Sequence, residues 1–200
     1  MQAENIIQPT TLNLILSILM GLGLSASCGF RVFAPFLMMG IASQAGYLNL
    51  SSSFLWVAET YAIITFAVAT IIEIGAYYIP WLDNLLDTIA TPIAAIAGTL
   101  ATASVAPEMS PLLHWTIAAM GGGGLSVGVK LSSAAIRGAS TLTTAGTGNF
   151  IVSSAETSSS FVVSVIAITV PILVLLLLAV LAYFFYRSFS YLKNTKIKAS

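Results

Sequence analysis

The sequence predicts an all-α fold, a polytopic helical membrane protein with about five spans. Three observations support this fold class. Only 7% of the 200 residues are charged and 58% are hydrophobic, whereas a soluble domain carries about 25% charged residues. Apolar stretches reach the roughly 20 residues that a spanning helix needs, and glycines and serines interrupt two of the longest stretches. We therefore expect residues 1–200 to form a single transmembrane domain whose main partner is the lipid bilayer.

The clearest span is Phe161–Tyr186, which contains no charged residue and has Pro171 at a position where a kink is expected. Aromatic residues close this span, and Arg187 and three lysines follow them. Interfacial aromatics followed by basic residues are typical of a cytoplasmic helix end. We therefore expect a cytoplasmic C-terminus, with residues 188–200 as a basic tail.

Two further apolar segments follow simpler patterns. Phe54–Ile79 is long enough to span and carries Glu59 and Glu73. Thr88–Ala106 is shorter and is interrupted by Pro92.

Two longer regions, Thr11–Ala45 and Leu112–Thr147, each exceed one simple span. Both have glycines and serines in the middle and basic residues beyond them, which favours broken or re-entrant helices. Counting each region as one net crossing gives the five spans and places the N-terminus outside. Counting each region as a hairpin gives a different topology.

The two long regions also resemble each other. Similar stretches occur in the same order in both, and these are Met20–Ser25 with Met120–Ser126, and Gly46–Ser53 with Gly148–Ala155. The pattern predicts two halves, 11–106 and 111–187, that arose from one unit and run in opposite directions. Inverted repeats with interrupted helices are typical of transporter cores. The alternative is chance, because glycine and serine are common in membrane segments.

Charged residues inside apolar segments are the candidate site, because charge at membrane depth is costly and is usually paired. Arg31 is the only charged residue between Thr11 and Ser43. A polar stripe at helical spacing follows later in the chain, and its members are Ser126, Lys130, Ser133, Arg137, Ser140 and Thr144. Such a stripe lines water, an anion or partner carboxylates. Alternatively, the helix lies at the interface and its cations reach the headgroups. The predicted solute-binding residues are Arg31, Lys130, Ser133 and Arg137.

The acids predicted to balance these cations or to couple a proton are Glu73, Asp83, Asp87 and Glu156. Glu73 is the acid that we most expect to be buried and paired. Asp83 and Asp87 stand four residues apart at the start of a helical segment, where acids favour the helix dipole. In the alternative, they pair with Arg31 or Arg137, or they bind a cation or a proton.

Several classes of protein receive no support from the sequence. The net charge is zero and no basic excess indicates nucleic-acid binding. Cys28 is the only cysteine and His114 the only histidine, so neither an internal disulfide nor a metal site is predicted. The glycine run Gly121–Gly124 lacks the Lys-Ser/Thr of a phosphate loop, but it allows close helix packing and a homo-oligomer. No Lys or Arg precedes the first apolar run, which argues against a cleaved signal peptide. We expect no cofactor and no enzymatic activity.

Three motifs of the chain, from about Gly21 to Glu156, resemble a bacterial membrane-protein family catalogued as domain of unknown function 4126. The residues that carry the resemblance are Gly29, Arg31 and Pro35 in the first motif, Asp83, Asp87, Thr91 and Pro92 in the second, and Lys130, Arg137, Asn149 and Glu156 in the third. The chain departs from the family where members often have a basic residue shortly after the Thr-Pro pair, because Ile93, Ala94 and Ala95 follow here. The resemblance implies an integral membrane protein and implies no activity.

Two functions are consistent with these patterns. The first is a small transporter or channel for an anionic or proton-coupled solute, in the bacterial cytoplasmic (inner) membrane. The alternative is a non-enzymatic membrane scaffold or assembly factor with static buried ion pairs. Transport predicts a water-reachable cavity that touches Arg31 and the polar stripe. Static pairing predicts a dry interior in which every charge meets an opposite one.

Overall fold

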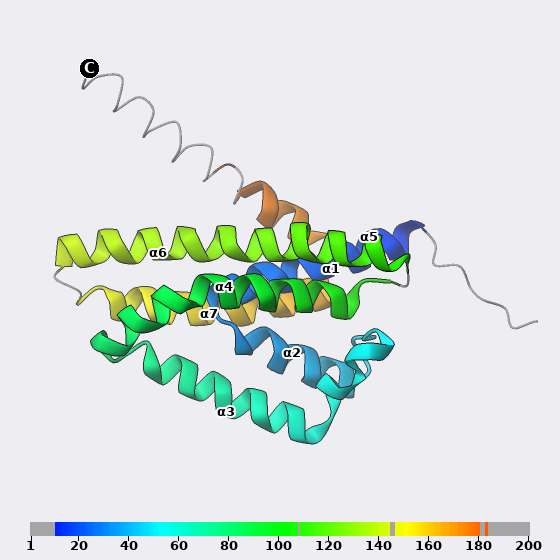
Figure 1. The fold of residues 1–200 in the computed structure, drawn as a ribbon, viewed down its shortest axis with the longest axis horizontal. Coiled ribbons are helices and arrows are strands. Elements are labelled where there is room, and N and C mark those ends of the chain that lie inside the picture. Colours follow the sequence, from blue (N-terminus) through cyan, green and yellow to red (C-terminus); the bar gives the residue numbers. More distant parts are fainter. Residues whose placement is uncertain (1–10, 108, 145–146, 181–182, 184–200) are drawn as a thin grey trace, which may run out of the picture.

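The computed structural model describes residues 11–107, 109–144, 147–180 and 183. Helices are the regular elements of these residues and no strand occurs among them, which confirms the all-α prediction (Figure 1). The predicted basic tail, 188–200, lies outside the described residues.

The helices of the first half are α1 (Thr11–Phe30), α2 (Phe33–Gln44), the 3-10 helix η1 (Ser52–Ala58), α3 (Thr60–Ala76) and α4 (Pro80–Val105). Those of the second half are α5 (Pro111–Thr116), the π-helix η2 (Ile117–Gly123), α6 (Gly124–Thr144) and α7 (Asn149–Thr169). Residues 173–180 are also helical.

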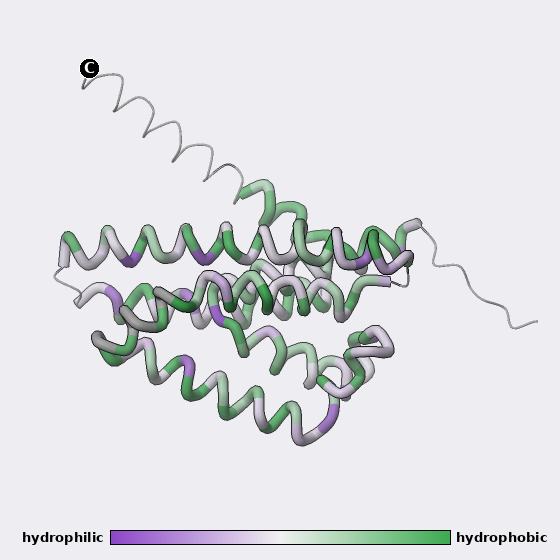
Figure 2. The backbone as a smooth tube through the Cα atoms, viewed as in Figure 1, coloured by the Kyte–Doolittle hydropathy of each residue, from purple (hydrophilic) through white to green (hydrophobic). Residues whose placement is uncertain are grey.

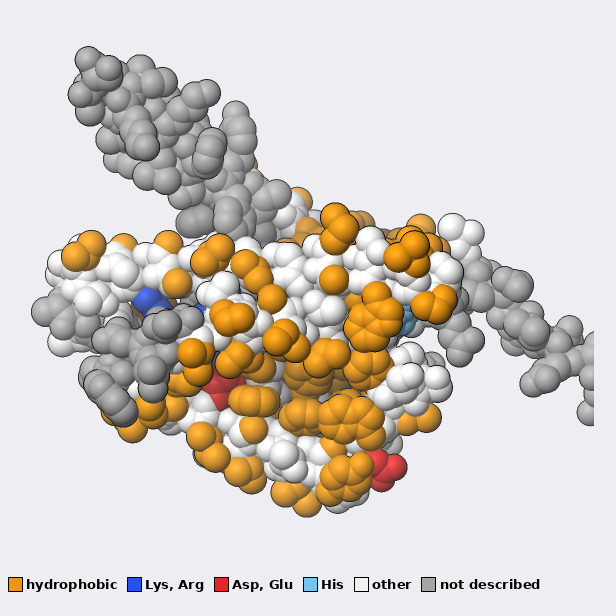
Figure 3. All heavy atoms as spheres, in the orientation of Figure 1, with side chains coloured by type: hydrophobic (Ala, Val, Ile, Leu, Met, Phe, Trp, Pro, Cys, Tyr) orange, Lys and Arg blue, Asp and Glu red, His pale blue; other side chains and the backbone are white. Residues whose placement is uncertain are grey.

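Among the described residues, three helical stretches are long and apolar enough to cross a membrane. They are α1, the continuous helix Pro111–Thr144 and α7. A fourth results if η1 and α3, which are bent by 67° relative to each other, count as one span. The membrane assignment is thus supported, and the five-span topology stays a prediction. Figures 2 and 3 show hydrophobic residues along the helices and in many patches of the visible face, which is consistent with a lipid-facing surface.

The first long region is broken, as predicted. α1 ends at Phe30 and α2 begins at Phe33, and the chain turns back on itself between them (Figure 1). The prediction of a break is wrong for Leu112–Thr147, because one helix continues from Pro111 to Thr144. Most of its glycine run lies in the π-helix η2. The wider turns of η2 change the hydrogen-bond pattern locally, but they do not end the helix.

The two prolines within predicted spans behave differently. Pro92 stays inside α4, which continues to Val105. At Pro171 the effect is larger than the expected kink, because α7 ends at Thr169 and a turn precedes the helical residues 173–180.

Small side chains let α1 sit at the centre, packed against α4, α6 and α7. A Cβ atom added to Gly21 would lie 3.1 Å from Thr102, and one added to Gly23 would lie 2.6 Å from the Cβ of Ala167. Buried serines join the helices as well, since the hydroxyl of Ser27 donates to the carbonyl of Ser160 at 2.5 Å. Close approach of small residues, with hydroxyls as bridges, is how membrane helices associate.

Contacts between α1 and the helix of the second half show their relative direction. Leu22 approaches Gly121, the hydroxyl of Ser25 donates to the carbonyl of Gly122, and Gly29 approaches Ser126. Residue numbers rise together in both helices, so the helices that carry the matching glycine motifs run parallel. An inverted repeat requires them to be antiparallel, so that prediction is wrong for this pair. The reason is the reversal between α1 and α2, which adds one pass of the chain to the first half (Figure 1).

Candidate functional site

Arg31 lies at the break between α1 and α2 and is completely buried, with 0% of its surface exposed. Its backbone amide still donates to the carbonyl of Ser27 at 3.1 Å, so the break begins directly after it. Pro35 stands in the first turn of α2, where the absence of an amide hydrogen costs nothing. The break therefore directs the guanidinium into the protein interior.

Glu73, from α3, caps the start of α2. Its Oε1 accepts from the backbone amide of Val32 at 2.8 Å and its Oε2 accepts from that of Phe33 at 3.1 Å. A carboxylate is favourable here because free amide hydrogens and the helix dipole both attract negative charge. We expected a cation as the partner of Glu73, and the structure instead gives it two backbone amides.

We predict that Glu73→Ala lowers the free energy of unfolding by about 1–2 kcal/mol, because two amides at a helix start lose their acceptor. Glu73→Gln is expected to lose less, since its carbonyl oxygen still caps one amide. Denaturant titration of the protein in micelles, followed by circular dichroism, measures both values. Glu59→Ala, at an exposed position just before α3, is the control. Equal stabilities of Glu73→Ala and Glu59→Ala would argue against the cap.

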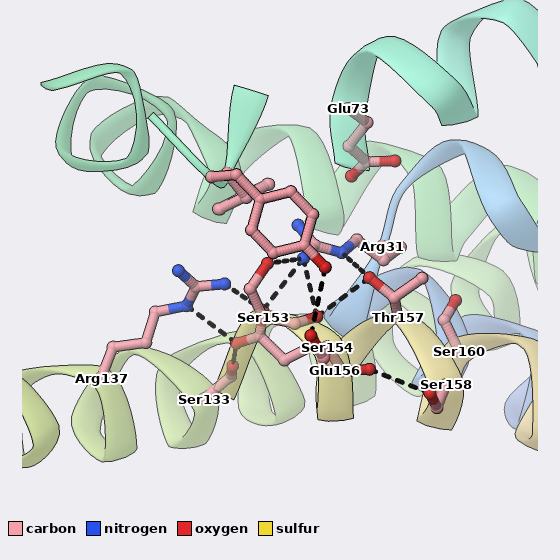
Figure 4. A network of polar contacts seen from close by, with 12 residues as sticks. Arg31, Glu73, Ser133, Arg137, Ser153, Ser154, Glu156, Thr157, Ser158 and Ser160 are labelled. Atoms are coloured by element: carbon pink, nitrogen blue, oxygen red, sulfur yellow. Dashed lines mark hydrogen bonds and ion pairs between the residues drawn. The ribbon is translucent and has the colours of Figure 1, made fainter. Parts of the chain in front are cut away.

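The side chain of Arg31 binds α7 (Figure 4). Its Nε donates to Oγ1 of Thr157 at 3.1 Å, and its Nη2 donates to the hydroxyl and the carbonyl of Ser153 at 2.6 and 3.0 Å. The same Nη2 lies 3.6 Å from Oε2 of Glu156. Nη1 is buried and makes no hydrogen bond. One edge of the guanidinium is therefore fixed, and the other lacks an acceptor.

Glu156 joins α6 to α7 and connects two guanidiniums. Arg137 donates to Oε1 through Nε at 2.9 Å and to Oε2 through Nη2, and the hydroxyl of Ser133 also donates to Oε1. Because Arg31 is near the same carboxylate, one anion is shared by two buried cations. Such a network is costly to bury, so it lasts only while its members stay paired and hydrogen-bonded.

Tyr77, the residue after α3, lies among three cations. The Cζ atoms of Arg31 and Arg137 are 4.0 and 4.6 Å from the centre of its ring, and Nζ of Lys130 is 5.2 Å from that centre. Nζ of Lys130 also donates to the phenol oxygen at 3.1 Å. The neighbouring Tyr78 shares a hydrogen bond with Ser154 at 3.1 Å and holds the turn against α7.

The structure brings together most of the residues predicted for the site. Arg31, Lys130, Ser133, Arg137 and Glu156 are all buried within one network. Lys130 and Arg137 are 2% and 3% exposed, so the stripe faces protein, which contradicts the alternative of an interfacial helix. The burial of the stripe decreases towards the C-terminal end of α6, where Ser140 is half-buried and Thr144 is exposed. Asp83 and Asp87 belong to α4, but their side chains lie outside the described residues.

Sequence reasoning missed Tyr77, Ser153 and Thr157. The last two had a detectable signal, because Ser153, Thr157, Ser160 and Ser164 recur at helical spacing and form the face of α7 that meets α1. Tyr77 had no such signal, since an aromatic residue at a helix end also fits an interfacial anchor.

A groove of about 690 Å³ lies between α6 and α7. Apolar residues such as Ile136 and Val152 line most of it, and Ser133 and Glu156 lie at its wall. Arg31 and Lys130 are not among the lining residues. This groove therefore reaches the network at Ser133 and at the shared carboxylate of Glu156. The described part of the chain contains no cluster of three or more potential metal ligands.

The fold and this network define a class, the helical membrane proteins with a charged centre buried among their helices. Within that class, the model of the family described as "Domain of unknown function (DUF4126)" matches residues 18–190. The chain belongs to this family, which confirms the resemblance seen in the sequence. No curated protein and no solved structure matches the chain significantly.

Proposed function

We propose that the protein is a small transporter or channel for an anionic solute, located in the bacterial cytoplasmic membrane with a cytoplasmic C-terminus. The observation that carries the proposal is the buried Nη1 of Arg31, which has no hydrogen-bond partner. A guanidinium edge without an acceptor in a low-dielectric interior attracts an anion strongly. Lys130 and Arg137 lie near the same aromatic ring as Arg31, that of Tyr77.

The position of this edge supports the proposal as well. Membrane transporters often bind their solutes where a spanning helix is interrupted, close to the ends of the half-helices. Arg31 stands at a comparable pair of helix ends, where the chain reverses between α1 and α2. In this proposal Arg31, Lys130, Ser133 and Arg137 bind the solute, and Glu73, Asp83, Asp87 and Glu156 balance charge or couple a proton. No catalytic role is assigned to any of them.

A second candidate is a membrane scaffold with static ion pairs. It is favoured by the complete burial of Arg31 and by the tight hold of Arg137 and Ser133 on Glu156. The groove between α6 and α7 does not include Arg31 among its lining residues, which also agrees with a closed interior. The two candidates differ in one measurable property, the movement of a solute.

The experiment is a flux assay with the purified protein in liposomes. A gradient of chloride, phosphate or acetate is imposed, and a pH-sensitive dye and a potential-sensitive dye report movement. We expect flux of at least one anion, reduced about tenfold or more in Arg31→Gln, because a tenfold change corresponds to only about 1.4 kcal/mol.

Arg31→Lys, which keeps the charge but loses the fork of donors, is the matched variant and is expected to retain part of the flux. Size-exclusion chromatography and circular dichroism establish that each variant is folded. Folded wild-type protein that moves none of the anions would reject transport and favour the scaffold.

A further inference from the structure

The site proposed above is closed on one side by a short turn. α3 packs mainly on α2 and η1, and the turn formed by residues 77–79 joins it to α4. Tyr77, in that turn, is only 6% exposed and covers the cations, while the ring of Tyr78 packs against that of Phe150 at a tilt of 39°, with ring centres 4.8 Å apart. One turn therefore both covers the site and attaches to α7.

The side chain of Tyr77 occupies a place that also suits an anion. The ring presents the weak negative potential of its face to Arg31 and Arg137, and the phenol oxygen accepts from Lys130. A carboxylate or phosphate would offer the same cations a full negative charge and more acceptors, and bonds to such ions are stronger than cation–π contacts. These contacts between Tyr77 and the three cations are thus ones that an oxyanion can replace.

We propose that Tyr77 is a gate residue, and that the solute which takes its place is a small oxyanion. The inference rests on the proposed transport function and deepens it. In the closed state the ring covers Arg31, Lys130 and Arg137. In the open state the turn of residues 77–79 moves away from α7, and the oxyanion binds Nη1 of Arg31 and Nζ of Lys130.

The geometry favours an oxyanion over a halide. Each of the two guanidiniums is a planar fork that matches a group with two or more oxygens. Arg137 already holds a carboxylate, Glu156, through two nitrogens, and Lys130 already donates to an oxygen. The carboxylate and the phenol oxygen that Arg137 and Lys130 bind are both oxygen acceptors, which is the type of group that an oxyanion would offer.

The first test measures access to the site without measuring flux. Ser153, a buried partner of Arg31, is replaced by cysteine in a Cys28→Ala background, so that it is the only thiol. The protein is reacted in nanodiscs with methanethiosulfonates of similar size, one anionic and one cationic. We expect Tyr77→Ala to raise the rate of modification about tenfold, the effect of losing contacts of this strength. The anionic reagent is expected to react faster than the cationic one.

Tyr77→Phe is the matched control, because it keeps the ring and removes only the phenol oxygen, and it is expected to stay close to wild type in access. Phosphate and acetate are expected to slow the modification in Tyr77→Ala, and chloride at the same ionic strength is not. A rate that is the same in wild type, Tyr77→Phe and Tyr77→Ala would overturn the gate. Protection by chloride equal to that by phosphate would overturn the choice of an oxyanion.

The second test locks the turn. Tyr78→Cys and Ser154→Cys, introduced together, are joined by a reducible cross-linker that spans the length of the lost phenol ring, because the native side chains of these two residues meet through their hydroxyls at 3.1 Å. We expect the cross-link to abolish anion flux and reduction to restore it, while each single cysteine variant stays active after treatment. Undiminished flux in the cross-linked protein would reject the gate but not transport. A Tyr77-dependent change in access in a protein without any flux would reject transport and keep the gate.

Discussion

Glu156→Gln is expected to lower the free energy of unfolding by about 3–5 kcal/mol, the usual cost of removing one partner from a buried ion pair. The carboxylate accepts from Arg137 and Ser133 and lies 3.6 Å from Arg31, so its loss leaves two guanidiniums without their shared anion. The amide also brings two hydrogens to a place where only donors converge. Denaturant unfolding in micelles measures this loss.

The control for Glu156 is Glu59→Gln, the same chemical change at an exposed position next to α3. Surface substitutions usually change stability by no more than about 0.5 kcal/mol. A comparable small effect at Glu156 would mean that its charge contributes nothing to holding α6, α7 and the α1–α2 break together. The network described for the site would then be incorrect.

Gly29→Ala is expected to lower the free energy of unfolding by about 1–3 kcal/mol, because it overfills a packed interface. A Cβ at this position would lie 2.6 Å from the carbonyl oxygen of Ser126 and 2.6 Å from the Cβ of Val129. Neither atom is the end of a flexible side chain, so α6 must shift away from α1. Lys130, the next residue after Val129, would shift with it.

Gly138→Ala is the matched control, since nothing lies within 4 Å of the added methyl group. There the same change is expected to stabilise the protein by up to about 1 kcal/mol, the difference in helix propensity between glycine and alanine. The test compares the two changes in the free energy of unfolding, which are expected to have opposite signs. A stabilising Gly29→Ala would show that α1 and α6 do not pack as closely as described.

The general architecture followed from composition and spacing. So few charged residues could not cover a water-facing surface, and the glycine and serine content of Thr11–Ala45 indicated the break that the structure shows. The periodicity of Lys130, Ser133 and Arg137 placed them on one helix face, because helical spacing is a local property of the sequence. The sequence also placed Arg31 correctly in the interior, because a charge within an apolar segment is costly to expose to lipid and therefore faces protein.

The remaining features depend on tertiary contacts that leave no local pattern. The glycines of η2 suggested a break, but in the structure the helix continues and these glycines allow its close contact with α4, since a Cβ on Gly122 would lie 2.6 Å from the carbonyl oxygen of Gly98. Glu73 binds backbone amides, which every residue type except proline carries. The cations around Tyr77 come from the α1–α2 break and from α6, and no spacing in the sequence connects them to its ring.

The central place of α1 also determines when the protein can be completed. The hydroxyls of Ser25 and Ser27 find their acceptors 97 and 133 residues later in the chain, and the hydrogen-bond partners of Arg31 belong to α7. In hydrocarbon the serine hydroxyls can bond carbonyl groups of their own helix meanwhile, but the guanidinium remains unsatisfied until its partners have been synthesised and inserted. α1 is therefore synthesised well before the helices that complete its environment, and a chain that stops before α7 leaves an unpartnered arginine in the bilayer. We expect such truncated chains to be cleared by membrane quality control, a fate that pulse-chase labelling would reveal.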